Sequence, residues 1–88
     1  MKARFYDPHP GFGGAIVRLP QPFKAVADAL DGQEMTVEEA MEEIRIAGDG
    51  LKYKIEVLDC DDYIGLRIRE GEDEYSLHSW RLIRYEKL

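Results

Sequence analysis

The spacing of hydrophobic residues along the chain changes at residue 51. Between residues 21 and 47, apolar side chains recur every three or four positions, which is the period of an amphipathic helix. From residue 51 onward they mostly alternate with polar side chains, which is the period of a half-buried strand. The pattern therefore predicts a helical segment followed by a run of strands.

The first helical pattern lies in QPFKAVADALDG, which starts at residue 21. Pro22 suits the first turn of a helix, and Gly32 is placed to end it. The apolar positions share one face of this short helix: Phe23, Val26, Ala27 and Leu30.

The second helical pattern lies in MTVEEAMEEIRIAGDG and has the clearest helix start in the chain. Thr36 and Glu39 have the spacing of a capping box, in which two N–H groups are satisfied reciprocally. The face predicted to be buried carries Val37, Ala40, Met41 and Ile44. The opposite face is acidic and carries Glu38, Glu39, Glu42 and Glu43.

The remaining segments predict strands. Two short runs, at residues 2–6 and 14–19, are rich in aromatic and β-branched residues. Three alternating runs follow residue 51, and a last run, WRLIRYEKL, changes phase; a bulge near Ser79 or a separate strand would each explain this. We expect an α+β fold in one domain, residues 1–88. Its mostly antiparallel sheet has four to six strands, a C-terminal meander and both helices on one face.

Turn chemistry suggests how the C-terminal strands pair. A two-residue turn at Gly71–Glu72 would place Ile68 opposite Tyr75, Leu66 opposite Leu77 and Arg69 opposite Glu74. We expect Ile64, Leu66 and Ile68 to point inward.

A four-residue turn at 59–62 would place Val57 opposite Ile64 in the preceding hairpin, and would bring basic residues together on the open side of the sheet. This predicted basic face consists of Lys52, Lys54, Arg67 and Arg69, with Lys54 opposite Arg67 and Lys52 opposite Arg69. One interpretation is that neighbouring glutamates neutralise these cations; the other is a docking face for an acidic partner or a phosphate backbone.

The overall charge favours basic partners. The chain has 18 acidic and 12 basic side chains, a net charge of −6 and a pI near 4.8, which argues against casual binding to nucleic acid or anionic membrane. A single cysteine, Cys60, excludes an internal disulfide and a cysteine-based zinc cluster. No apolar run has the length of a signal peptide core or a membrane span, so we expect a cytoplasmic protein.

Signatures of catalysis and of metal or cofactor binding are missing from the sequence. The two histidines, His9 and His78, have no ligand spacing, and the acidic turn DCDDY lacks the glycine and terminal glutamate of a calcium loop. The stretch DPHPGFGG, at residues 7–14, lacks the lysine of a phosphate-binding loop and is expected to be a turn. We expect no enzyme, no metal and no cofactor.

The leading hypothesis is a non-enzymatic protein-binding module, regulatory or inhibitory, that occupies a surface of a larger, basic, nucleic-acid-binding protein. Contacts would come from the acidic helix face and from the 7–14 loop, through His9 and Phe12, although Phe12 folded back onto the sheet is an equal alternative. In size and charge the chain resembles the inhibitors and accessory proteins that phages and mobile elements encode, including anti-CRISPR proteins.

Two further hypotheses stay open. One is a nucleic-acid-binding module that uses the predicted basic face, with Tyr63 stacking on a base. The other is a structural subunit whose exposed sheet edge pairs with another copy or another chain. The sequence leaves homo-oligomerisation open.

Overall fold

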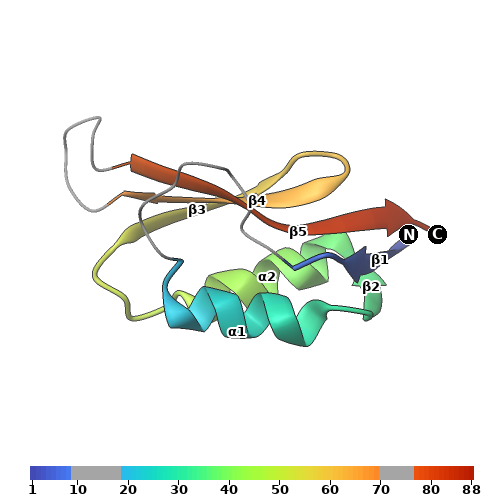
Figure 1. Ribbon diagram of the computed structural model, residues 1–88, viewed down its shortest axis with the longest axis horizontal. Coiled ribbons are helices and arrows are strands. Elements are labelled where there is room, and N and C mark those ends of the chain that lie inside the picture. The colour runs from blue at the N-terminus through green and yellow to red at the C-terminus, as the bar shows by residue number, and fades with distance from the viewer. Residues whose placement is uncertain (9–18, 70–76) are drawn as a thin grey trace.

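The computed structural model describes residues 1–8, 19–69 and 77–88. Within these ranges the chain forms a five-stranded antiparallel sheet with two helices against one face, which confirms the α+β prediction (Figure 1). The strand order is β2-β1-β5-β4-β3. The elements are β1 (Lys2–Tyr6), α1 (Gln21–Leu30), β2 (Glu34–Thr36), α2 (Val37–Ala47), β3 (Lys54–Asp59), β4 (Tyr63–Arg69) and β5 (Leu77–Lys87).

Helix α1 is fixed to the sheet at its C-terminal end. Phe23, Ala27 and Leu30 are buried, as the helical spacing predicts. Gly32 follows the helix with a φ of 81°, which favours glycine, and its N–H donates to the carbonyl of Phe5 in β1 at 2.8 Å. The residue that follows the helix therefore bonds directly to the N-terminal strand.

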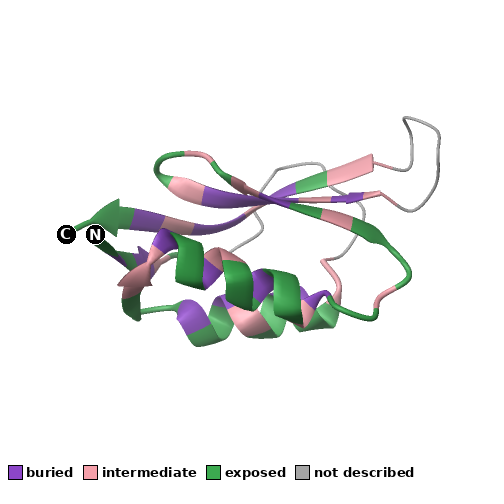
Figure 2. Ribbon diagram, turned by 180° about the vertical axis from the view of Figure 1, so that it is seen from behind, coloured by how far each residue is buried: buried purple, intermediate pink, exposed green. Residues whose placement is uncertain are grey.

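The short strand β2 was not predicted; it pairs with β1 and leads straight into α2. The predicted N-cap of α2 is confirmed, since the Thr36 hydroxyl accepts from the Glu39 N–H at 3.1 Å. The Glu39 carboxylate accepts from the Thr36 hydroxyl at 3.0 Å, where the capping box predicts a bond from the Thr36 N–H. Val37, Ala40 and Ile44 are buried. The four predicted glutamates are exposed on the side of α2 turned away from the sheet (Figure 2).

The hydrophobic core lies between the helices and one face of the sheet. Ile64, Leu66 and Ile68 of β4 are buried there, as predicted. On β5 the alternation is broken by a bulge: Gly65 lies opposite Arg81 and Ile64 opposite Ile83, so that Leu82 is the extra residue. Leu82 and Ile83 are consequently both fully buried, which explains the phase change in the sequence.

The predicted β3–β4 pairing is wrong by two residues. Val57 lies opposite Leu66, not Ile64, because the turn is tighter than expected. The Asp59 carboxylate accepts the Asp61 N–H at 3.0 Å, Asp61 has a φ of 75°, and the Cys60 N–H already bonds back across the hairpin at 3.0 Å. Since a shift of two preserves the side of every residue, the predicted inward set survives.

The predicted β4–β5 pairing is wrong by three residues. Leu66 lies opposite Trp80, Ile68 opposite His78 and Arg69 opposite Leu77. An odd shift exchanges the two sides of a strand, so Leu77 joins the open side of the sheet and His78 the covered side. We attribute this register to the burial of Trp80 opposite Leu66.

Several predictions fall outside the described residues. The expected strand at 14–19 lies there except for Leu19, which is not in a strand. The proposed contact residues His9 and Phe12 also lie there, as do the turn at Gly71–Glu72 and the predicted partners Glu74 and Tyr75.

Candidate interaction surfaces

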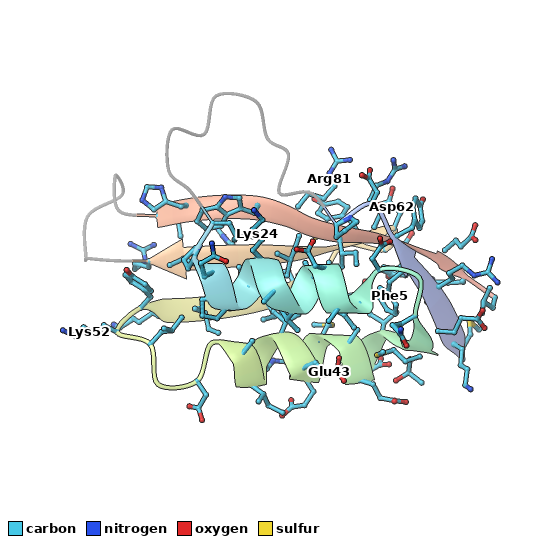
Figure 3. All side chains as sticks on the ribbon, turned by 60° about the horizontal axis from the view of Figure 1, so that its bottom comes forward. Phe5, Lys24, Glu43, Lys52, Asp62 and Arg81 are labelled. Carbon is cyan, nitrogen blue, oxygen red and sulfur yellow. The ribbon has the colours of Figure 1, made fainter. Side chains whose placement is uncertain are left out.

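The side of the sheet opposite the helices, which we call the open sheet face, is basic and aromatic. Alternate residues of each strand point to this side, because their neighbours point into the core. Figure 3 shows Arg81 directed away from the two helices. The described members that matter here are Arg4, Tyr6, Lys54, Glu56, Leu58, Tyr63, Arg67, Arg69, Leu77, Ser79, Arg81 and Arg84.

Two arginines of β5 lie over tyrosine rings of the neighbouring strands. The Arg81 guanidinium carbon is 5.4 Å from the centre of the Tyr63 ring, and that of Arg84 is 5.3 Å from the centre of the Tyr6 ring. Arg84 also lies 3.7 Å from the Asp7 carboxylate. These cation–π contacts restrict two long side chains that would otherwise sample many rotamers.

The predicted basic face is assembled in part. Lys54, Arg67 and Arg69 lie together and, with Leu77, line a shallow hollow of about 170 Å³. The predicted opposite pairs are wrong, because Lys54 lies opposite Arg69 and Arg67 opposite Glu56. The Arg67 guanidinium lies 3.5 Å from the Glu56 carboxylate, so this cation is partly neutralised. Lys52 precedes β3 and extends from the end of the molecule (Figure 3).

A second hollow of about 270 Å³ lies over Gly65, whose missing side chain leaves the space open. Its walls include Leu58, Cys60, Tyr63 and Ser79. A hydrogen bond with the Cys60 side chain raises the pKa of the Tyr63 hydroxyl. The open sheet face thus combines fixed charge with a shaped, partly apolar depression.

The outer surface of the helices, which we call the acidic helical face, contrasts with this arrangement. Residues 21–50 contain eight acidic and two basic side chains, so this segment alone carries a net charge of −6. On α2, Glu39 takes part in the helix cap and Glu42 lies 3.4 Å from Arg45. Glu43 points away from the sheet in Figure 3.

Sequence reasoning missed Tyr6, Arg81 and Arg84. The phase of the last strand was ambiguous, and without the bulge at Leu82 no single alternation can place both arginines on the open side. The signal was present, since two basic residues flank an adjacent apolar pair in RLIR. Such a doublet is typical of a bulge, where two successive side chains share one face.

Of the two histidines, His78 lies within the described residues and His9 does not. His78 is half-buried on the covered side of the sheet, with its ring centre 6.1 Å from that of Trp80. Among residues 1–8, 19–69 and 77–88, no group of three histidine, cysteine or acidic side chains is placed to hold a metal ion.

A search for membrane-spanning helices and three comparisons with known proteins bear on what the chain is. No helix in the described part of the chain has both the length and the apolar character needed to cross a membrane. Protein-family models, curated proteins and solved structures give no match to this sequence. The surfaces described above are therefore the basis for a functional proposal.

Proposed function

We propose that the protein is a non-enzymatic binding module that occupies an acidic patch on a larger protein and acts as a regulator or inhibitor. The open sheet face is the contact surface. The observation that carries this proposal is the pair of arginine–tyrosine stacks, Arg81 on Tyr63 and Arg84 on Tyr6.

The residue types of the open sheet face are those of protein interfaces. Arginine and tyrosine are enriched at interface hot spots, where they supply area, hydrogen bonds and charge. Side chains that are already held in place lose less conformational entropy on binding. Leu58 and Leu77 add half-buried apolar area between the cations.

The acidic net charge does not prevent such a contact. The acidic helical face is separated from the open sheet face by the helical layer, which is itself about 10 Å thick. The Debye length at physiological ionic strength is about 8 Å, so charges at this separation are largely screened. An acidic partner approaching the sheet would therefore respond mainly to the nearby arginines.

A protein partner fits this surface better than a nucleic acid. A phosphate backbone requires a continuous basic track, with affinity that depends on the number of phosphates neutralised. Arg67 is already paired with Glu56, and four acidic residues occur in the 70–76 connection next to Arg69 in the sequence. A protein patch needs only local complementarity and buried area.

The acidic helical face is a second candidate, with a basic protein as its partner. It is favoured by the concentration of the net charge in residues 21–50. An inhibitor of the phage or mobile-element kind would fit this charge and the small size of the chain. A free cysteine, Cys60, fits a cytoplasmic location, where thiols stay reduced.

Matched charge-reversal variants distinguish binding through the open sheet face from binding through the acidic helical face. Tagged wild-type protein, the sheet variant R67E/R84E and the helix variant E38K/E43K are each used to capture partners from nuclease-treated lysate of the source cells. We expect a protein that the wild type and the helix variant retain, that the sheet variant loses, and that elutes as salt is raised. Thermal unfolding of all three proteins checks that the fold is intact.

Other outcomes would contradict the proposal. Loss of capture in the helix variant alone would assign binding to the acidic helical face. A partner captured from untreated lysate but not from nuclease-treated lysate would point to nucleic acid. Fluorescence anisotropy with a single-stranded oligonucleotide at low salt would then show binding that the sheet variant lacks.

A further inference from the structure

β3 lies at an edge of the sheet, and an edge strand can pair with a further strand. β3 is the last strand of the sheet, and within the described residues no strand lies beyond it. The Cys60 N–H bonds to the Tyr63 carbonyl at 3.0 Å, which fixes the alternation of the ladder. Residues 54, 56 and 58 therefore bond to β4, while Ile55 and Val57 direct their N–H and C=O groups outward.

A hollow of about 530 Å³ runs along this same edge, between β3 and the C-terminal end of α2. Tyr53, Ile55 and Val57 line it from the strand side, and residues 48–51 line it from the loop after α2. Tyr53 is 37% exposed and Ile55 is half-buried, so apolar side chains are accessible on the strand side of the hollow, beside Glu56. An added strand would find both backbone partners and a place for large side chains.

We propose that a second copy of this chain pairs antiparallel with the outer edge of β3, with the two-fold axis at Ile55. Outward-bonding residues must lie opposite outward-bonding residues, which restricts the axis to positions 54, 55, 56 or 57. An axis at Lys54 or Glu56 would place that charged residue opposite its own copy. An axis at Val57 would place the apolar Ile55 opposite Asp59.

The axis at Ile55 is complementary from position 53 to position 57. Lys54 lies opposite Glu56 of the second copy, twice by symmetry, and Tyr53 lies opposite Val57, also twice. The Glu56 side chain is 60% exposed, so it is accessible to Lys54 of the second copy. Within one chain, Lys54 lies opposite Arg69, so the second copy would supply an acidic neighbour on its other side.

The pairing joins the two sheets edge to edge and places two open sheet faces side by side. Only a few residues per strand take part, and Tyr53 must extend the strand by one position, so the interface belongs to the small, transient class. We expect a concentration-dependent dimer. This inference concerns the edge of the sheet and does not depend on the proposed function of its open face.

Charge exchange at two positions tests the register. Sedimentation analysis of the wild type between about 10 μM and about 1 mM is expected to show a monomer–dimer equilibrium. K54E and E56K each place like charges opposite one another twice, and should raise the dissociation constant about tenfold or more. The double variant K54E/E56K restores opposite charges and should restore dimerisation.

The control is K52E, which changes charge by the same amount as K54E. In this register residue 52 lies opposite Leu58 of the second copy, so K52E should leave dimerisation within about twofold of the wild type. A wild type that stays monomeric at about 1 mM would overturn the proposal. Dimerisation that K52E impairs as much as K54E, or that the double variant does not recover, would overturn it too.

Crosslinking provides a second measurement. In a C60S background, I55C places two thiols across the axis, where hydrogen-bonded partners have α-carbons about 5.5 Å apart, within disulfide range. K52C in the same background places the thiols roughly six residues out of register. We expect an oxidised dimer with I55C and little with K52C; equal yields would overturn the register.

Discussion

The two faces of strand β4 show how differently this sheet uses its two sides. Ile64, Leu66 and Ile68 point to the helices and are almost fully buried. Their neighbours Tyr63 and Arg67 point to the open side and are half-buried. The covered side is stabilised by close packing of apolar side chains. The open side is stabilised by pairwise contacts between charged groups and aromatic rings. Stability and binding are therefore expected to respond to different residues of one strand.

The sharpest test of this difference uses adjacent residues. Leu66→Ala should lower the free energy of unfolding by about 2–5 kcal/mol, because it leaves a cavity in the core. Arg67→Ala removes a half-exposed ion pair with Glu56 and should cost about 0.5 kcal/mol or less. Urea unfolding measures both, and comparable losses would show that the open side also carries stability.

A single methyl group added at Gly48, on the covered side of the sheet, should also lower stability. A side-chain carbon on Gly48 would collide with Ile55 Cδ1 and would lie 2.8 Å from Phe23 Cζ, where the end of α2 meets β3 and α1. Gly48→Ala should therefore cost about 1–3 kcal/mol in urea unfolding. Ile55→Val removes the Cδ1 atom, so the double variant G48A/I55V should lose less than the two single variants added together. Simple additivity would contradict the collision.

A hydrogen bond at the rim of the sheet should have an intermediate effect. The Tyr85 hydroxyl donates to the Asp59 carboxylate at 2.5 Å and so joins β5 to the β3–β4 turn. Tyr85→Phe should lower the free energy of unfolding by about 1–2 kcal/mol at neutral pH. Tyr53→Phe, which alters an exposed residue, is the control and should change stability by about 0.5 kcal/mol or less.

The same hydrogen bond predicts a pH window. It lowers the pKa of Asp59 below its ordinary 3.8, so this contribution is present above about pH 4 and is lost as pH falls through the lowered value. Burial, and then the bond to Asp59, raises the pKa of Tyr85 above its ordinary 10.0, so its contribution is present below about pH 10 and is lost as pH rises. The stability difference between wild type and Y85F should be greatest between these limits; a difference that is constant with pH would contradict the assignment.

The sequence predicted which face of a strand or helix a residue occupies better than it predicted which residue lies opposite it in the next strand. The inward residues of β4 and the exposed glutamates of α2 follow from periods of two and 3.6, which a slip of two residues in the β3–β4 pairing does not disturb. The pairing itself depends on the turns. The β3–β4 turn is set by the Asp59 carboxylate bonding to Asp61, and the β4–β5 register by the burial of Trp80. Neither contact is visible as a periodic pattern.

The open sheet face was only partly predictable for the same reason. Lys54, Arg67 and Arg69 lie on regular strands, so alternation placed them on one side. Arg81 and Arg84 are three residues apart, and only the bulge at Leu82 turns both to that side. A bulge depends on which apolar side chains the core can accept, and that is decided by packing between elements distant in the sequence.

The smallest expected effect on stability comes from substitutions of Gly65, which change the shape of the open sheet face without changing its charge. A methyl group on Gly65 would lie 3.4 Å from Cys60 Sγ and 3.6 Å from a Tyr63 ring carbon, which are ordinary contacts. Because glycine weakens a strand relative to alanine, Gly65→Ala should leave stability unchanged or raise it by about 0.5 kcal/mol in urea unfolding. Gly65→Leu would fill the hollow without altering any charge, and we expect it to weaken partner capture although Arg67 and Arg84 remain. Full capture by Gly65→Leu would mean that the partner recognises the cations of this face alone and that the depression over Gly65 plays no part in binding.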